Sequence, residues 1–160
     1  MSVPIVVDEW LLEDLMGSDL KKQKQAIDFI WKVVEICDTI VILEDSPFQK
    51  KIWNMMKGSR NGSVTLRVAS QAFEGLIRSN KDKVYPLAQG DIKSLPTHLI
   101  PLINSAKDHY LFQSYLKLKN KGSFILTTDG RWNHDGLRKT GIEIKMRDQF
   151  VPGYLSRQLP

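Results

Sequence analysis

Short segments with the pattern of β-strands recur along the chain. Three of them are mainly apolar runs of four or five residues, too short for a stable helix and typical of strands buried on both faces. A fourth segment, IEIKM, alternates apolar and polar residues as an edge strand does. The pattern therefore predicts strands near residues 4–7, 39–43, 124–128 and 142–146.

Between these strands, apolar residues recur every three or four positions, which predicts helices. We expect a short helix over residues 9–16, a longer one capped by Ser18 or Asp19, one from Pro47 to Met56 or Lys57, and one from Lys107 to Lys121-Gly122. In the longer helix, Ile27, Ile30, Trp31 and Val34 would form the face that packs on the core.

The middle of the chain has a less regular pattern. Residues 64–77 fit either one helix or a strand followed by a helix, and we favour a helix that begins near Ser70. Residues 81–106 contain two turn signals and a proline-interrupted apolar segment, so we expect a loop and a short helix there.

Strands that alternate with helices of ten or more residues predict a mainly parallel sheet, because each crossover brings the chain back to the same end of the sheet. Such a sheet is covered by helices on both faces. We therefore expect a three-layer α/β/α fold with a central, mainly parallel sheet. At 160 residues, the chain fits a single domain spanning residues 1–160.

Acidic residues follow the predicted strands. Asp8 ends the first strand, Glu44 and Asp45 end the second, and Asp129 follows the third. Asp108 lies at the start of the last long helix. Because ligands of parallel sheets gather at the carboxyl ends of the strands, we expect these acids to meet at one edge.

Carboxylates that converge in this way repel one another and favour a bound cation. Oxygen ligands suit Mg or Mn, whereas the three histidines have no zinc spacing and the one cysteine adds no soft ligand. We expect Asp8, Asp108 and Asp129 to share a Mg or Mn ion, with Glu44 or Asp45 beside them. Such an ion can activate water against a phosphodiester. The alternative is that each acid, taken alone, is a helix cap or a turn former.

Charge adds a preference for a polyanionic partner. The chain has 23 Lys and Arg against 18 Asp and Glu, a net charge of +5 that favours phosphate contacts. No segment approaches the roughly 18 uncharged apolar residues of a membrane span, and the first residues lack a basic leader. We therefore expect a cytoplasmic protein without a membrane partner, in which Cys37 is a buried, unreactive thiol.

Two other phosphate-handling classes lack their defining residues. A haloacid-dehalogenase-type phosphatase also opens with an Asp at a strand end, but it needs a second Asp two positions later, where this chain has Trp10. No glycine cluster follows a predicted strand and leads into a helix, so a phosphate loop is absent from the sequence.

Three stretches resemble the PIN domain, a family of small metal-dependent nucleases that includes many toxin ribonucleases. They are IVVDEWLL with Asp8, KDHYLFQSYLKLKNKGSFILTTDGRW with Asp108 and Asp129 separated by 21 residues, and GIEIKMRDQFV. The resemblance implies that the three aspartates are metal-coordinating catalytic acids and that Thr128 is the hydroxyl that precedes the last acid. SPFQKKIWNMM departs from the family pattern, because it lacks the acid usually found in the helix after the second strand.

The resemblance implies a Mg- or Mn-dependent endoribonuclease, with a toxin-type enzyme among the options, and RNA as partner, with single-stranded RNA favoured. A homodimer and an antitoxin-like protein partner stay open. The alternative is a non-catalytic PIN-like module that binds RNA or protein. Arg131 and Trp132 follow Asp129 and could contact a phosphate and stack on a base. The alternative for each residue alone is that Arg131 is solvated and that Trp132 packs against the sheet edge. The other candidates for RNA contact are Lys50, Lys51, Lys57 and Arg60.

Overall fold

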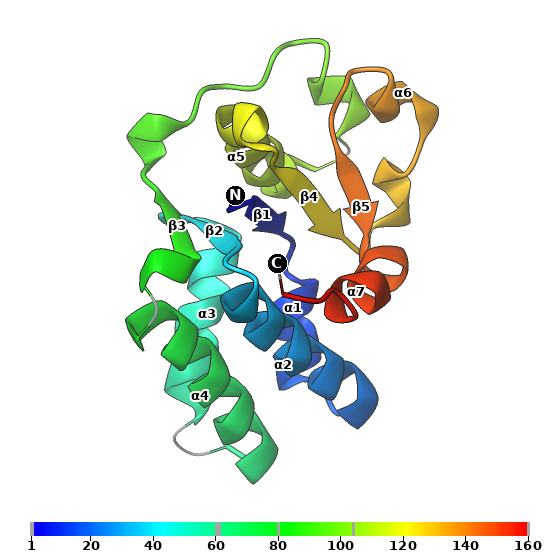
Figure 1. The fold of residues 1–160 in the computed structure, drawn as a ribbon. Helices are drawn as coiled ribbons and strands as arrows, with labels where there is room; N and C mark the ends of the chain where they lie inside the picture. The colour runs from blue at the N-terminus through cyan, green and yellow to red at the C-terminus, as the bar shows by residue number, and fades with distance from the viewer. Residues whose placement is uncertain (1, 60–61, 80, 104, 160) are drawn as a thin grey trace.

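A five-stranded parallel sheet forms the centre of the protein (Figure 1). The computed structural model describes residues 2–59, 62–79, 81–103 and 105–159, so Arg60 lies outside the described residues. The strand order is β3-β2-β1-β4-β5, and all four strand pairings are parallel. The strands are β1 (Pro4–Val7), β2 (Thr39–Leu43), β3 (Val84–Leu87), β4 (Phe124–Thr127) and β5 (Ile144–Met146).

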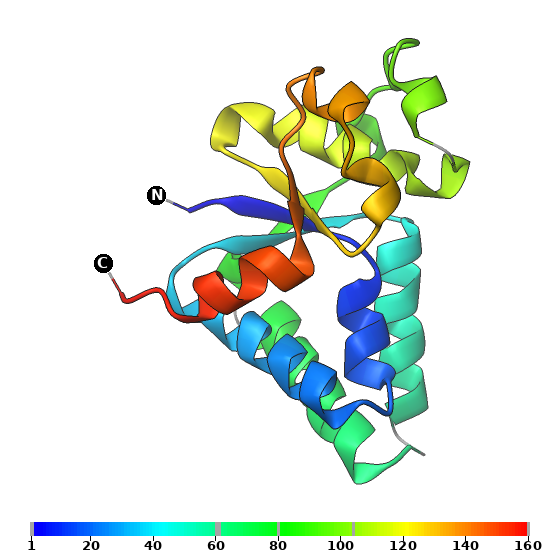
Figure 2. The same ribbon diagram turned by 90° about the vertical axis from the view of Figure 1, so that its right-hand side faces the viewer.

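Helices cover both faces of this sheet, as Figure 2 shows with α5 on one side and α1, α2 and α4 on the other. The helices are α1 (Trp10–Met16), α2 (Leu20–Glu35), α3 (Pro47–Gly58), α4 (Val64–Ser79), α5 (His109–Leu118), α6 (Asp135–Arg138) and α7 (Arg147–Leu155). Every residue of β1, β2 and β4 is buried, as expected for strands covered on both faces. The predicted three-layer α/β/α fold with a parallel sheet is confirmed.

Two parts of the middle region differ from the prediction. Residues Val84–Leu87 form strand β3, where a loop was expected. This strand contains Pro86, which lacks an amide donor and is tolerated because β3 lies at an edge of the sheet. Helix α4 begins at Val64 instead of near Ser70, and the amide of Leu66 donates to the Ser63 hydroxyl across its first turn, at 3.2 Å.

The end of α2 also corrects two expectations. Cys37 is exposed, because α2 ends at Glu35 and Cys37 lies in the turn to β2 with a left-handed φ of 65°. Trp31, expected on the core face of this helix, has 53% of its surface exposed, whereas Ile30 beside it is buried. Within the described parts of the chain, no helix combines the length and the apolar character needed to cross a membrane.

Candidate functional site

Asp8, Asp108 and Asp129 come from three separate segments to the carboxyl edge of the sheet. Asp8 directly follows β1 and Asp129 lies two residues beyond β4, which pairs with β1 in parallel. Asp108 precedes α5, which packs on both strands. The charge of Asp108 raises the pKa of Asp8, and the charge of Asp129 raises the pKa of Asp108, so Asp108 interacts electrostatically with both of the other acids. We call these three residues the acidic cluster.

Hydrogen bonds fix the carboxylate of Asp8. Its Oδ1 accepts from the amide of Glu9 at 2.7 Å, and its Oδ2 accepts from the hydroxyl of Thr127 at 2.8 Å. The same Thr127 oxygen accepts from the amide of Asp129 at 3.0 Å. Thr127 is fully buried and therefore links two members of the acidic cluster.

The hydroxyl next to the acids belongs to Thr127 and not to Thr128, the residue expected from the resemblance. Successive side chains of a strand point to opposite faces, so only one of two neighbouring threonines can turn toward Asp8. Thr127 is the last residue of β4 and takes that position, whereas Thr128 lies beyond the strand and is exposed.

Burial is the main cause of the raised pKa of both Asp8 and Asp108. For Asp8, the hydrogen bonds from Glu9 and Thr127 oppose this effect, and the nearby charges of Asp108 and Glu9 add to it. For Asp108, the charge of Asp129 adds to it and the charge of Arg131 opposes it. Asp108 accepts no hydrogen bond from the described amides of α5, so it does not serve as a helix cap.

Arg131 supplies the positive charge nearest to the acidic cluster. Its Nε lies 2.9 and 3.0 Å from the two carboxylate oxygens of Asp129, and its terminal nitrogen lies 2.5 Å from one of them. The same terminal nitrogen is 3.9 Å from Asp108. These hydrogen bonds lower the pKa of Asp129. Arg131, expected to contact a phosphate, therefore binds an acid of the cluster in this structure, with 55% of its side chain exposed.

Two residues at the site were missed by the sequence reasoning. The charge of Glu9 raises the pKa of both Asp8 and Asp108, and Glu9 itself pairs with Lys51 at 3.2 Å. Tyr110 is buried, and its hydroxyl has no hydrogen-bond partner among the described residues. Burial and the charges of Asp8, Glu9 and Asp108 raise its pKa. Glu9 directly follows Asp8, and Tyr110 lies two positions after Asp108. Closeness in sequence to a predicted acid was therefore the signal that could have identified both residues.

Three other predicted residues lie away from the acidic cluster or have a different role. Trp132 is 1% exposed and packs edge-on against Phe112, with ring centroids 5.1 Å apart, so its indole is not available to stack on a base. Glu44 lies at a neighbouring pocket between β2, β3 and α3. Lys50 is exposed on α3, the helix that also contains Lys57.

The acidic cluster fits Mg or Mn in the chemistry of its ligands, since carboxylate oxygens suit hard divalent ions. Its arrangement is less favourable. Both oxygens of Asp8 accept hydrogen bonds, and Asp129 is bound by Arg131. Across the described residues, no three His, Cys, Asp or Glu side chains are placed as a group that could hold a metal. Binding of an ion by all three acids therefore requires Arg131 to release Asp129.

Comparison with known proteins identifies no family for the chain. No protein-family model matches the sequence, and no curated protein matches it. The PIN-domain resemblance therefore stays a prediction.

Proposed function

We propose that the acidic cluster is the divalent-cation site of a PIN-like endoribonuclease, which hydrolyses RNA phosphodiester bonds. The observation that carries this proposal is the meeting of Asp8, Asp108 and Asp129 at one edge of the sheet, where Thr127 links Asp8 to Asp129 and Arg131 contacts both Asp129 and Asp108. Repelling carboxylates disfavour the ionised state, and a divalent cation removes that repulsion. A second observation is the buried Tyr110 hydroxyl in the field of two of these acids, without a partner among the described residues.

In this proposal, Asp8, Asp108 and Asp129 would hold Mg or Mn, which supplies positive charge to activate water and to neutralise the phosphodiester. Thr127 keeps Asp8 oriented through its 2.8 Å hydrogen bond. Arg131 is exposed, so its guanidinium can move from Asp129 to a phosphate of the RNA backbone.

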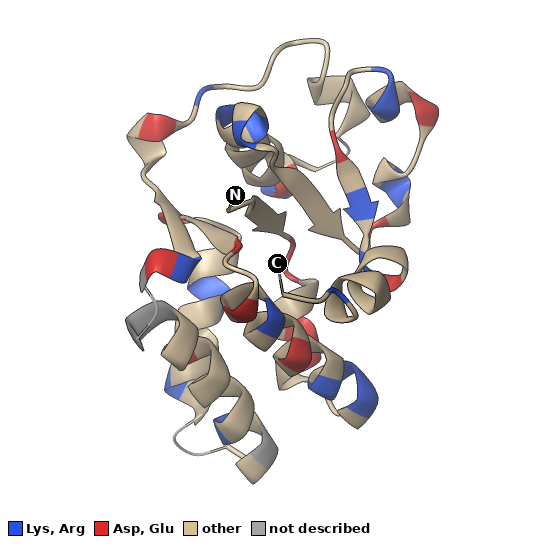
Figure 3. Ribbon diagram, viewed as in Figure 1, with Lys and Arg blue, Asp and Glu red and all other residues tan. Residues whose placement is uncertain are grey.

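The distribution of charge agrees with weak, distributed contacts to a nucleic-acid backbone. Lys and Arg are spread over several elements, including α2, α5 and the segment around β5, as Figure 3 shows. The net charge of +5 favours a polyanion through counterion release. Lys50, exposed on α3, is one candidate for such a contact.

A second function is favoured by the Arg131–Asp129 pair. A guanidinium that already neutralises Asp129 lets the acidic cluster exist without a metal, as in a non-catalytic PIN-like module that binds RNA or protein. The absence of an acid from SPFQKKIWNMM points the same way.

Cleavage of labelled single-stranded RNA, with Mn and with a chelator, tests the enzyme against the binding module. The variants are Asp8→Asn and Asp129→Asn, and Asp135→Asn is the matched control because its carboxylate is exposed on α6. The nuclease predicts Mn-dependent cutting that is lost in both site variants and kept in the control. RNA binding at low salt without cutting, equal in all four proteins, would support the binding module.

A further inference from the structure

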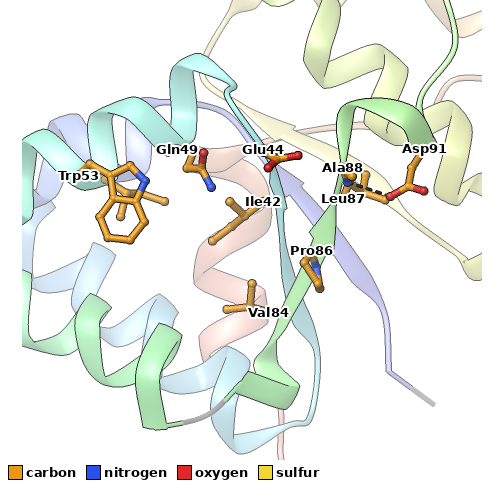
Figure 4. A pocket seen from close by; sticks show the side chains of 10 residues that line it. Ile42, Glu44, Gln49, Trp53, Val84, Pro86, Leu87, Ala88 and Asp91 are labelled. Carbon is orange, nitrogen blue, oxygen red and sulfur yellow. Dashed lines mark hydrogen bonds between the residues drawn. The ribbon is translucent and has the colours of Figure 1, made fainter.

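A pocket of about 530 Å³ lies between β2, β3 and α3 (Figure 4). Its volume is within the range of small-molecule and cofactor sites. Helix α3 forms one wall and the edge strand β3 forms another. The function proposed above leaves this pocket unused.

The floor of the pocket is apolar and its rim is polar. Ile42, Val84 and Leu87 belong to the apolar part. Trp53 on α3 is 48% exposed, so its indole offers a flat apolar face to a ligand. Figure 4 shows this indole on one side, the carboxylate of Asp91 on the opposite side and the carboxylate of Glu44 between them.

The backbone on both sides of Glu44 is held in place. Its amide donates to the carbonyl of Leu87 at 2.8 Å, and its own carbonyl accepts from the side chain of Gln89 at 2.6 Å. The Glu44 carboxylate makes no hydrogen bond or ion pair with any described residue. It is therefore an acceptor that remains open to a ligand.

Gln49 adds a donor next to this acceptor. Its side-chain carbonyl accepts from the amide of Asp45 at 2.9 Å. Since a backbone amide can only donate, the oxygen of Gln49 must face Asp45, and its NH₂ group is left for another partner. Asp91 is partly used, because one of its oxygens accepts from the amide of Ala88 at 2.8 Å.

We propose that this pocket binds a guanine base of single-stranded RNA. The base edge of guanine presents two neighbouring donors, the ring N1–H and the N2 amino group, which match one carboxylate in a bidentate manner. The adjacent O6 is an acceptor that matches the NH₂ group of Gln49. Uracil offers a single ring donor, so it cannot form the paired contact with Glu44.

The base and the phosphates would occupy different surroundings. A neutral base stacks on Trp53 over the apolar floor, whereas phosphates are kept out of the pocket by the charges of Glu44 and Asp91. Strand β2 lies between β1 and β3 in the sheet, and Glu44 and Asp8 each directly follow their strand. A base bound at Glu44 would therefore sit at the same carboxyl edge of the sheet as the acidic cluster.

This inference rests on the proposed function, because it assigns the pocket to the RNA that the acidic cluster cuts. Binding is measured with a chelator present, so that no metal-dependent cutting occurs. The probes are pentanucleotides of uridine with the central base either guanine, adenine or uracil, and the readout is the dissociation constant by fluorescence anisotropy. The variants are Glu44→Gln and Trp53→Ala. Trp31→Ala is the matched control, because Trp31 is similarly exposed but lies on α2.

The pocket predicts that the guanine probe binds about tenfold more tightly than the uracil probe. Glu44→Gln should remove this preference, Trp53→Ala should weaken binding of all three probes, and Trp31→Ala should change neither. Equal binding of all three probes by the wild type, no binding of any probe, or a guanine preference unchanged in Glu44→Gln would overturn the inference. If the guanine preference is present but the RNA cleavage assay shows no Mn-dependent cutting, the guanine-binding inference is supported and the nuclease proposal fails. If cleavage occurs without the preference, only the pocket proposal fails.

Discussion

The guanidinium of Arg131 binds both carboxylate oxygens of Asp129, with its Nε 2.9 and 3.0 Å from them. Two residues of one turn therefore form an ion pair at the edge of a site that also contains two further acids. Since Arg131 is exposed, solvent screens this pair and limits its contribution to stability. Its main effect is electrostatic, because it lowers the pKa of Asp129 and opposes the rise in the pKa of Asp108.

Replacing Arg131 should change the titration of Asp129. Hydrogen bonds from Arg131 are the first cause of the lowered pKa of Asp129, so Arg131→Gln should raise that pKa toward its ordinary value. A lowered pKa stabilises the fold above the ordinary pKa of the carboxyl, and this contribution is lost as the pH falls through the lowered value. Carbon-13 NMR titration of the Asp129 carboxyl measures the shift directly.

Arg138→Gln is the control for this titration. Arg138 is also exposed, and it pairs with Asp135 at 3.6 Å instead of with the acidic cluster. An Asp129 pKa that is unchanged in Arg131→Gln, or raised equally in Arg138→Gln, would contradict the role assigned to Arg131.

Replacing Asp108 should lower the pKa of Asp8. The charge of Asp108 contributes to the raised pKa of Asp8, and Asn at position 108 removes that charge. A carboxyl whose pKa is raised in the folded state makes the fold less stable as the pH rises from the ordinary pKa of the carboxyl through the raised pKa. Asp108→Asn should therefore be as stable as the wild type near pH 3 and equally or more stable at pH 7.

Urea unfolding of Asp108→Asn at the two pH values checks this sign. The contrary result is a variant that is less stable than the wild type at pH 7 only. That outcome would mean that the 3.9 Å contact between Arg131 and Asp108 outweighs the repulsion between Asp108 and its acidic neighbours.

The pattern of strand ends was enough to predict that Asp8 and Asp129 lie at one edge of a parallel sheet, and the start of the last long helix added Asp108 to them. The choice between Thr127 and Thr128 depends on which residue is the last in β4, and the sequence pattern extended that strand by one residue. Trp132 was open to two interpretations, stacking on a base or packing against the sheet edge, and its ring packs on Phe112, a tertiary contact that no local pattern specifies. Strand β3 was missed because Pro86 interrupts its short apolar run.

The hydroxyl of Tyr154 should make a measurable contribution to stability. It donates to the carboxylate of Asp38 at 2.9 Å, and the other oxygen of Asp38 accepts from the amide of Val3 at 2.9 Å. Asp38 is 5% exposed, so Tyr154→Phe leaves a buried acceptor without one partner. We expect a loss of about 1–3 kcal/mol in the free energy of unfolding, measured by urea denaturation.

Tyr110→Phe provides the matched comparison for Tyr154→Phe. Its hydroxyl is also buried but has no partner among the described residues, so its removal leaves no group unpaired. The free energy of unfolding should stay the same or rise slightly. Equal losses in the two variants would show that the hydrogen bond to Asp38 is not the cause.

Titration of the protein with Mn in an isothermal calorimeter tests most directly whether the acidic cluster binds a divalent cation. The proteins are the wild type, Asp8→Asn, Asp129→Asn and the exposed-acid control Asp135→Asn. We predict Mn binding by the wild type and the control, and loss of that binding in both site variants, because each removes an oxygen ligand and a negative charge. No Mn binding by the wild type, or binding that is the same in Asp129→Asn, would contradict the proposed site.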